Sequence, residues 1–212
     1  MNKRLPRKFY TQSTLKIAKQ MLGKYLVRKI GSKKLIGKIV ETEAYIGPED
    51  KASHAYQGKI TERNKAEYLI GGHIYIYLVY GMYWQLNIST GNEGQPECVL
   101  IRALEPIITK NSKSQIPNHK QISKTEPPQA YLKSKIQNLT NGPGKLCRWL
   151  KLDKSFYGED LVKSKRIWLE EGEKIKPSQI IASKRIGIDY AEEWADVPWR
   201  FYIKNNPFVS RI

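Results

Sequence analysis

A run of alternating aliphatic and aromatic residues, "IYIYLVYGMYWQLN" at residues 74–87, constrains the fold more than any other stretch of the chain. Ile74, Ile76 and Leu78 alternate with tyrosines, and side chains two residues apart share one face of a β-strand. The run therefore predicts a strand with an aliphatic core face and a tyrosine face. The glycine after Tyr80 marks a turn into a second strand, so the segment predicts a β-hairpin with Tyr80 at its end.

The tyrosine face allows two interpretations. Flat aromatic side chains stack on purines, so Tyr77, with Tyr45 and His54 from the preceding segments, predicts the walls of a base-binding slot. Tyr80 has the position of a side chain that wedges into a DNA minor groove. Alternatively, the tyrosines pack as a second hydrophobic core, in which each buried hydroxyl needs a hydrogen-bond partner. The residues alone leave both interpretations open.

The other segments predict one mixed α/β domain with mostly antiparallel strands. Residues 13–22 have the apolar spacing of a helix that buries Leu15, Ala18 and Leu22. A second, short helix is predicted with Pro143 in its first turn. The remaining predicted strands are residues 24–30, 34–45, 97–106, 166–171, 180–188 and 199–204.

The charge of the chain predicts a polyanionic partner. Its 37 lysines and arginines against 20 acidic residues give a net charge of +17, which attracts nucleic acid or an anionic membrane surface. No segment resembles a basic amphipathic membrane helix, and no apolar run approaches the ~20 residues of a membrane span, so nucleic acid is favoured. A merely solvated, lysine-rich surface is the alternative.

The cysteines do not predict a disulfide framework. Cys98 and Cys147 both lie in apolar sequence, so a reducing, cytoplasmic compartment is expected. The two cysteines and three histidines lack metal-ligand spacing, and we expect neither a metal nor a cofactor. Residues 110–138 are lysine-rich and without periodicity, which predicts a long surface insertion. Its lysines either contact phosphates or form a solvated loop.

Charged residues interrupt two of the predicted strands. In "IVETEAY", Glu41, Glu43 and Tyr45 share one face, which predicts carboxylates facing a cleft; acids that blunt an edge strand are the alternative. Arg102 interrupts the apolar run "CVLIRAL", where a guanidinium needs an acidic partner. Such a partner is either a carboxylate held ionised to act as a base, or half of a structural ion pair.

Six motifs follow one another along the chain: "ETEAYIGPEDKASHA", "RN" at 63–64, "YIYLVYGMYWQLNIS", "VLIRALEP", "NGPGKLC" and "RIGIDYAEEWA". In this order they resemble the alkyladenine (3-methyladenine) DNA glycosylase family. The resemblance extends from about Leu22 to the C-terminus, which makes it more specific than a lone short motif. It implies a single α+β domain over residues 1–212, with a curved, mostly antiparallel sheet, flanking helices and a protruding β-hairpin. Residues 65–73 and Gln85 depart from the family's usual pattern.

The resemblance also implies catalytic groups. Glu43 would be the general base that deprotonates the water attacking the sugar C1′ of a damaged nucleotide. Arg102 and the main-chain carbonyl of Ile186 would help to hold that water and the carboxylate. The glutamate would also favour the positive charge that develops on the sugar, as carboxylates do in glycosidases.

Further matched residues are implied to hold the flipped base. Tyr45, His54 and Tyr77 would form the pocket walls, Asn87 would form its floor, and Tyr80 would enter the minor groove in place of the base.

Three residues are expected to contact DNA. Arg63 and Asn64 form the "RN" motif, and Lys145 belongs to "NGPGK". The latter lacks the full spacing of a nucleotide-binding loop and the Ser/Thr that follows its lysine. For Lys145, a phosphate contact on DNA and an ordinary surface residue remain as interpretations.

The expected function is a monofunctional DNA N-glycosylase that starts base excision repair. It would excise alkylated purines such as 3-methyladenine and 7-methylguanine, and deaminated ones such as hypoxanthine, by base flipping and without AP-lyase activity. We expect a monomer that acts on damaged double-stranded DNA in the bacterial cytoplasm, without cofactor or membrane. The alternative is a non-catalytic nucleic-acid-binding module of the same fold, which would not need a carboxylate at the pocket mouth.

Overall fold

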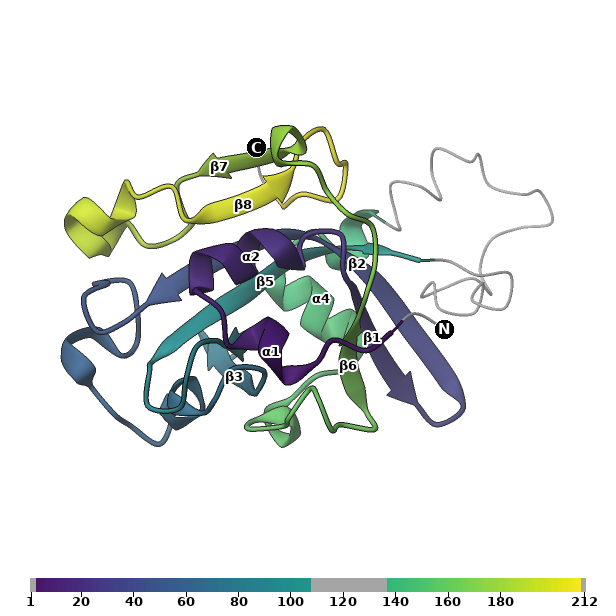
Figure 1. The fold of residues 1–212 in the computed structure, drawn as a ribbon, viewed down its shortest axis with the longest axis horizontal. Coiled ribbons are helices and arrows are strands. Elements are labelled where there is room, and N and C mark those ends of the chain that lie inside the picture. The colour runs from purple at the N-terminus through teal and green to yellow at the C-terminus, as the bar shows by residue number, and fades with distance from the viewer. Residues whose placement is uncertain (1–2, 108–136, 211–212) are drawn as a thin grey trace.

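The computed structural model describes residues 3–107 and 137–210 of the chain (Figure 1). These two stretches contain every residue predicted to belong to the site. The lysine-rich insertion predicted at about residues 110–138 lies almost entirely outside them.

An antiparallel sheet forms the body of the protein (Figure 1). Among the described residues it has eight strands, in the order β3-β4-β5-β2-β1-β6, with β8 added to β2 and β7 added to β8. The predicted α+β class with a mostly antiparallel sheet is confirmed. The strands are β1 (Tyr25–Ile30), β2 (Lys33–Ile46), β3 (Ile74–Val79), β4 (Tyr83–Ser89), β5 (Glu97–Pro106), β6 (Ile167–Glu170), β7 (Ile180–Ser183) and β8 (Arg200–Ile203).

The long strand β2 lies at the centre of the sheet. Its first half pairs with β1, its second half pairs with β8, and β5 runs along its other edge. The register with β5 shifts on both sides of Glu41, so the strand is irregular where the two acids lie. Because Glu41 and Glu43 lie in a segment paired on both sides, the alternative of an acid-blunted edge strand is ruled out.

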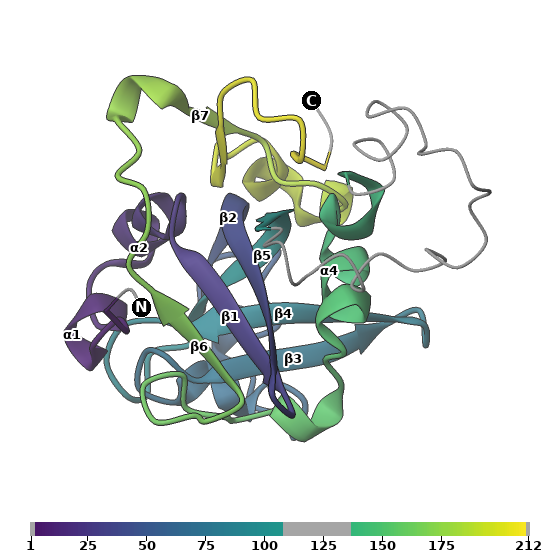
Figure 2. The same cartoon turned by 90° about the vertical axis from the view of Figure 1, so that its right-hand side faces the viewer.

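Helices α1 (Arg7–Tyr10), α2 (Thr14–Met21) and α4 (Pro143–Leu150) flank the sheet in the part of the chain that the structure describes. α2 packs against β2 and β5, and α4 packs against β4 and β5 (Figure 2). One cluster of buried apolar side chains joins these helices to the sheet. No helix in the described part of the chain has both the length and the apolar character needed to cross a membrane.

The predicted first helix is present and turns the expected face to the core. Ala18 and Leu22 are buried as predicted, and Leu15 is half-buried and packs against the core cluster. Ile17 and Met21, which the prediction did not single out, complete the buried face.

The predicted hairpin of β3 and β4 runs past α4 (Figure 2). Ile74 and Ile76 are buried in the core, but Leu78 is 37% exposed because this end of the hairpin has left the sheet. The prediction that Leu78 faces the core is therefore wrong. Gly144 of α4 allows close contact with the hairpin, since a Cβ there would lie 3.0 Å from the Cβ of Tyr83.

Candidate active site

The carboxylate of Glu43 lies at the bulged end of β2 and is held by three donors. Its Oε1 accepts from the Ile186 backbone N–H at 2.9 Å and pairs with the Arg102 Nη1 at 3.1 Å. Its Oε2 accepts from the Tyr45 hydroxyl at 2.8 Å. Glu43 is fully buried, and donors from three different residues occupy both of its carboxylate oxygens.

Arg102 on β5 links the two acids of β2. Its Nη1 faces Glu43, and its Nε lies 3.3 Å from Oε1 of Glu41. Burial by itself lowers the pKa of Arg102, but the charges of Glu43 and Glu41 outweigh it and raise this pKa above its ordinary value. The guanidinium is therefore a permanent positive charge beside Glu43.

Glu41 differs from Glu43 in its surroundings. Its carboxylate accepts from Arg200 Nε at 2.6 Å and from the backbone N–H and hydroxyl of Ser210 at 2.7 and 2.9 Å. With Arg102 it forms a buried ionic network that ties β2 to β8 and the C-terminal segment. Glu41 thus fits the structural ion pair, and the catalytic role of Glu43 stays a prediction.

A buried ion pair fixes the loop that carries Ile186. Arg185 contacts both carboxylate oxygens of Asp50, at 2.5 and 2.9 Å, and neither side chain is exposed. Its Nη1 also donates to the carbonyl of Ala44, and its guanidinium lies 4.8 Å from the ring centre of Tyr45. Our sequence reasoning missed this pair, although an arginine next to Ile186 in an apolar segment was a usable signal.

A surface cavity of about 770 Å³ opens over these groups. The start of α4, the end of β3 and the loop after β7 surround it. Tyr45, Arg102 and Ile186, the three residues that hold Glu43, all line this cavity. Five more residues that were predicted to belong to the site also line the cavity: His54, Arg63, Tyr77, Tyr80 and Lys145. Tyr190 lines it too, and the sequence analysis did not predict this tyrosine as part of the site.

His54 and Tyr77 form one aromatic wall of the cavity. Their ring centres lie 4.7 Å apart at an interplanar angle of 72°. His54 Nδ1 lies 2.6 Å from the Tyr75 hydroxyl, so Tyr75 supports the wall from behind. The Arg63 guanidinium covers the Tyr77 ring at 4.9 Å.

The charge state of His54 is set by its burial. Burial, together with the nearby charge of Arg63, lowers the pKa of His54 to about 4. The imidazole is therefore neutral near pH 7. A neutral ring in this wall does not repel a positively charged purine.

Replacing His54 with glutamine should make stability less sensitive to acid. The unfolded chain protonates His54 below about pH 6.5, whereas the folded protein does so only near pH 4. Folding therefore loses up to about 3 kcal/mol through this group as the pH falls through that window. Urea unfolding at pH 7 and at pH 4 should show a smaller loss for His54→Gln. Equal losses in both proteins would contradict the assigned burial.

Asn87 lies directly behind the cavity wall rather than on its surface. It is almost completely buried on β4, and its amide nitrogen donates to the backbone carbonyls of Tyr75 and Gln85, at 3.2 and 3.4 Å. Glu43 likewise has no exposed surface. Both predicted site residues are thus within one side-chain layer of the cavity, and their roles toward a base stay predictions.

Tyr80 is the most prominent aromatic of the hairpin end. It is 86% exposed, and Met82 beside it is also exposed. Tyr80 and Gly81 both have positive φ, at 52° and 67°, as in the tight turns that match the twist of a β-hairpin. A bulky residue seldom adopts this backbone, so the turn holds Tyr80 outward at a conformational cost.

The three expected DNA-contact residues have different places. Arg63 and Lys145 line the cavity, and the Lys145 amine bonds to the Asn141 side chain at 2.8 Å. Asn64 is fully buried: its amide donates to the carbonyls of His54 and Lys59, at 3.0 and 2.8 Å. Its side chain therefore shapes the loop that holds His54 and is not available for the DNA contact that we expected.

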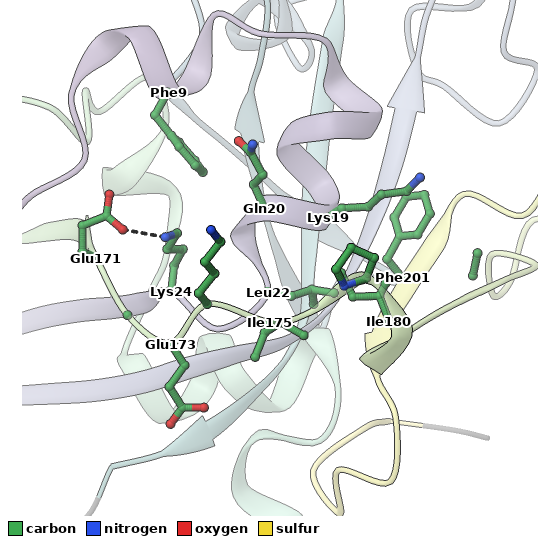
Figure 3. Close-up of a pocket in the computed structure, with 14 residues that line it drawn as sticks. Phe9, Lys19, Gln20, Leu22, Lys24, Glu171, Glu173, Ile175, Ile180 and Phe201 are labelled. Carbon is green, nitrogen blue, oxygen red and sulfur yellow. Dashed lines mark hydrogen bonds and ion pairs between the residues drawn. The ribbon is translucent and has the colours of Figure 1, made fainter.

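A second cavity, of about 640 Å³, lies elsewhere on the molecule (Figure 3). Residues of α2, the segment 171–177 and strands β7 and β8 line it. Lys24 and Glu171 form an ion pair at its edge. None of the predicted site residues reaches this cavity. Within the described residues, no group of three or more histidine, cysteine or acidic side chains is arranged to hold a metal ion.

Comparison with known proteins assigns the chain to a family. The sequence profile of a family described as methylpurine-DNA glycosylase (MPG) matches residues 8–207. A protein of Clostridium tetani is 48% identical over 208 residues, which cover 98% of this chain and 99% of the relative. A protein of Natranaerobius thermophilus is 45% identical over 207 residues, which cover 98% of each chain. Both are named "Putative 3-methyladenine DNA glycosylase". The chain therefore belongs to the methylpurine-DNA glycosylase family.

Proposed function

We propose that this protein is a monofunctional DNA N-glycosylase that hydrolyses the bond between a damaged purine and its deoxyribose. One observation supports this above all others: the three groups that hold the Glu43 carboxylate also line an aromatic cavity. The names of the bacterial relatives support 3-methyladenine as a substrate. The wider set, 7-methylguanine and hypoxanthine, rests on the chemistry of the cavity.

The aromatic cavity suits a flipped purine. The base would stack between Tyr45 on one side and the pair of His54 and Tyr77 on the other. Alkylation at N3 or N7 makes a purine cationic, so it is held well by electron-rich rings and leaves readily. Asn87, behind the wall, would discriminate against normal guanine. The high positive charge of the chain supports binding to the DNA backbone.

Hydrolysis requires a water molecule next to Glu43. In the structure the Tyr45 hydroxyl donates a hydrogen bond to Oε2 of Glu43, at the place that a water would take. We infer that entry of the base moves this hydroxyl and frees the oxygen for water. Glu43 would then take a proton from the water while the water oxygen attacks C1′. The base would leave with the electrons of the N-glycosidic bond. The carboxylate would also stabilise positive charge on the sugar. Arg102 and Ile186 would keep the water and the carboxylate in place.

The reaction would leave an abasic site in an intact strand. The test is incubation with duplexes that contain 3-methyladenine or hypoxanthine, followed by hot alkali, which cleaves abasic sites. Strand breaks only in lesion duplexes, and only after alkali, are expected. Tight lesion binding without breaks would instead favour a non-catalytic binding module.

Tyr80→Ala should weaken recognition of the lesion. An exposed aromatic that fills the gap left by a flipped base contributes roughly 1–3 kcal/mol, comparable to base–aromatic stacking. We therefore expect lesion affinity to fall about 5- to 150-fold, with a much smaller loss for Tyr80→Trp. Affinities would be measured on the same hypoxanthine duplex at fixed salt. Unchanged affinity in Tyr80→Ala would remove the wedge role.

We also propose a single-domain monomer that works on chromosomal DNA in the bacterial cytoplasm. The sheet joins strands from both ends of the chain, which supports one domain. The bacterial origin of the relatives supports the location.

A further inference from the structure

A buried acid lies behind the tyrosine wall and has no part in the reaction described above. Glu67 belongs to a short 3-10 helix, Lys65–Tyr68, and is only 2% exposed. Its Oε1 accepts from the Cys98 thiol at 3.2 Å. Its Oε2 is also buried and has no hydrogen-bond partner among the described residues. An acid with an unpartnered oxygen is costly to bury, so its presence requires a reason.

Glu67 is close to the predicted base pocket. Cys98 contacts Glu67 and also lies 3.9 Å from the side-chain oxygen of Asn87, the predicted pocket floor. Cys98 packs with Tyr75, and Tyr45 and Tyr77 of the pocket walls pack against the same cluster. Glu67 thus lies behind the cavity wall, separated from the proposed position of the flipped base by Cys98 and Tyr75 and by the wall residues that pack on them.

Among the residues that the structure describes, the groups that face Glu67 supply no positive charge. Burial, helped by the negative charge of Asp50, raises the pKa of Glu67 to about 8, although the Cys98 thiol opposes this. Arg63 reaches Tyr75 and Tyr77 but lies on the cavity side of the wall. The ionisable groups in electrostatic contact with Glu67 are Asp50, Tyr68, Tyr75, Tyr77, Cys98 and Tyr157.

We propose that Glu67 is a specificity residue, which supplies the counter-charge when the flipped purine is positively charged. This inference rests on the proposed function. A cationic base would be the positive partner that the buried carboxyl lacks, so Glu67 would release its proton to solvent as the base enters. By linkage, the resulting carboxylate strengthens binding of the cation by the same factor. A neutral base such as hypoxanthine gains nothing from this pair.

The test compares two lesions at several pH values. Excision of 3-methyladenine and of hypoxanthine would be measured between pH 5.5 and 8.5, for the wild type and for Glu67→Gln, which keeps the shape but cannot ionise. The enzyme would be kept well below saturation, so that each rate includes the binding of the lesion. At pH 8.5 the rate ratio of 3-methyladenine to hypoxanthine should be roughly tenfold lower in the variant. At pH 5.5 the two proteins should have similar ratios. Ionisation of the lesions themselves changes the rate ratio equally in both proteins, so it does not affect the comparison between them.

Two controls separate this role from a structural one. Glu62→Gln removes an exposed carboxylate five residues away, and its ratio should follow the wild type at every pH. Thermal unfolding reports whether Glu67 titrates as inferred. Between about pH 4.5 and pH 8 the folded wild type keeps a proton that the unfolded chain has released, so its stability falls as the pH rises. Glu67→Gln lacks this fall, and its gain in melting temperature over the wild type should be larger at pH 8 than at pH 5.

The outcomes distinguish the two levels of the proposal. If the wild type releases neither lesion, the proposed function itself fails. If it releases both and Glu67→Gln has the same ratio as the wild type at all pH values, only the role of Glu67 is overturned. A ratio that drops equally at pH 5.5 and 8.5 would also overturn it, because a structural change does not depend on ionisation.

Discussion

Glu43→Gln is expected to bind a hypoxanthine duplex with near wild-type affinity and to release the base about 10²- to 10⁴-fold more slowly. That range is what a positioned general base contributes. Glutamine has almost the same shape, so the cavity lined by Tyr45, Arg102 and Ile186 should persist, but an amide cannot take a proton from water. Single-turnover excision together with an equilibrium binding assay would separate the two effects.

Glu41→Gln is the matched control for this experiment. It removes the other acid that contacts Arg102, from the same strand, without touching the donors that Tyr45 and Ile186 supply to Glu43. We expect a loss of stability, because Arg200 and Ser210 lose a charged partner, with excision reduced much less than in Glu43→Gln. Equal losses of excision in the two variants would reduce Glu43 to a member of a structural ion-pair network.

The second large effect is expected from Asp50→Ala. Asp50 and Arg185 are both fully buried, and removing the acid leaves an unpaired guanidinium in the interior. Breaking such a pair costs about 3–5 kcal/mol of the free energy of unfolding. Because Arg185 precedes Ile186 and covers Tyr45, excision should also fall at temperatures where the variant is folded.

Urea unfolding at pH 7 would measure the cost of Asp50→Ala. The matched control is Asp196→Ala, which breaks the exposed pair with Lys184 and should cost less than about 1 kcal/mol. The double variant Asp50→Ala with Arg185→Met should recover part of the lost stability, since no unpaired charge remains. If Asp50→Ala lost no more free energy of unfolding than Asp196→Ala, the buried pair would not be what holds the Ile186 loop.

Local sequence patterns predicted the architecture well. Alternation of apolar and polar residues located the strands, although the strand predicted at residues 180–188 ends at Ser183. Turn residues located the hairpin after Val79. The helix at 13–22 and the helix starting at Pro143 both form. These features depend on neighbours in the chain, which the sequence displays directly. The prediction that Leu78 is buried failed, because the alternation of apolar and polar residues does not reveal where a strand leaves the body of the protein.

The site was only partly predictable. Arg102 was suspected of pairing with Glu41 or Glu43 because a charge in an apolar strand needs a partner, and the structure brings all three together. The pair of Asp50 and Arg185 was missed, although Arg185 in an apolar segment signals a buried charge that needs a partner. The sequence does not identify Asp50 as that partner, because the two residues are 135 positions apart and only tertiary packing brings them together.

Two residues show how burial changes a prediction. Asn64 belongs to a motif that suggests DNA contact, yet its side chain is consumed by hydrogen bonds inside its own loop. Glu67 is an ordinary acid in the sequence, and only its position behind Tyr75 and Cys98 gives it a raised pKa. A polar residue's function depends on which partners the fold leaves to it.

The proposed hydrolysis requires Glu43 to meet a water molecule at the sugar of a flipped nucleotide. A crystal structure of Glu43→Gln bound to a duplex with one hypoxanthine would show whether it does. We expect the base stacked between Tyr45 and the His54–Tyr77 wall, with a water within hydrogen-bond distance of the residue 43 side chain and facing C1′. A stacked base with the Tyr45 hydroxyl still covering residue 43, and no water between that side chain and the sugar, would rule out the proposed role of Glu43.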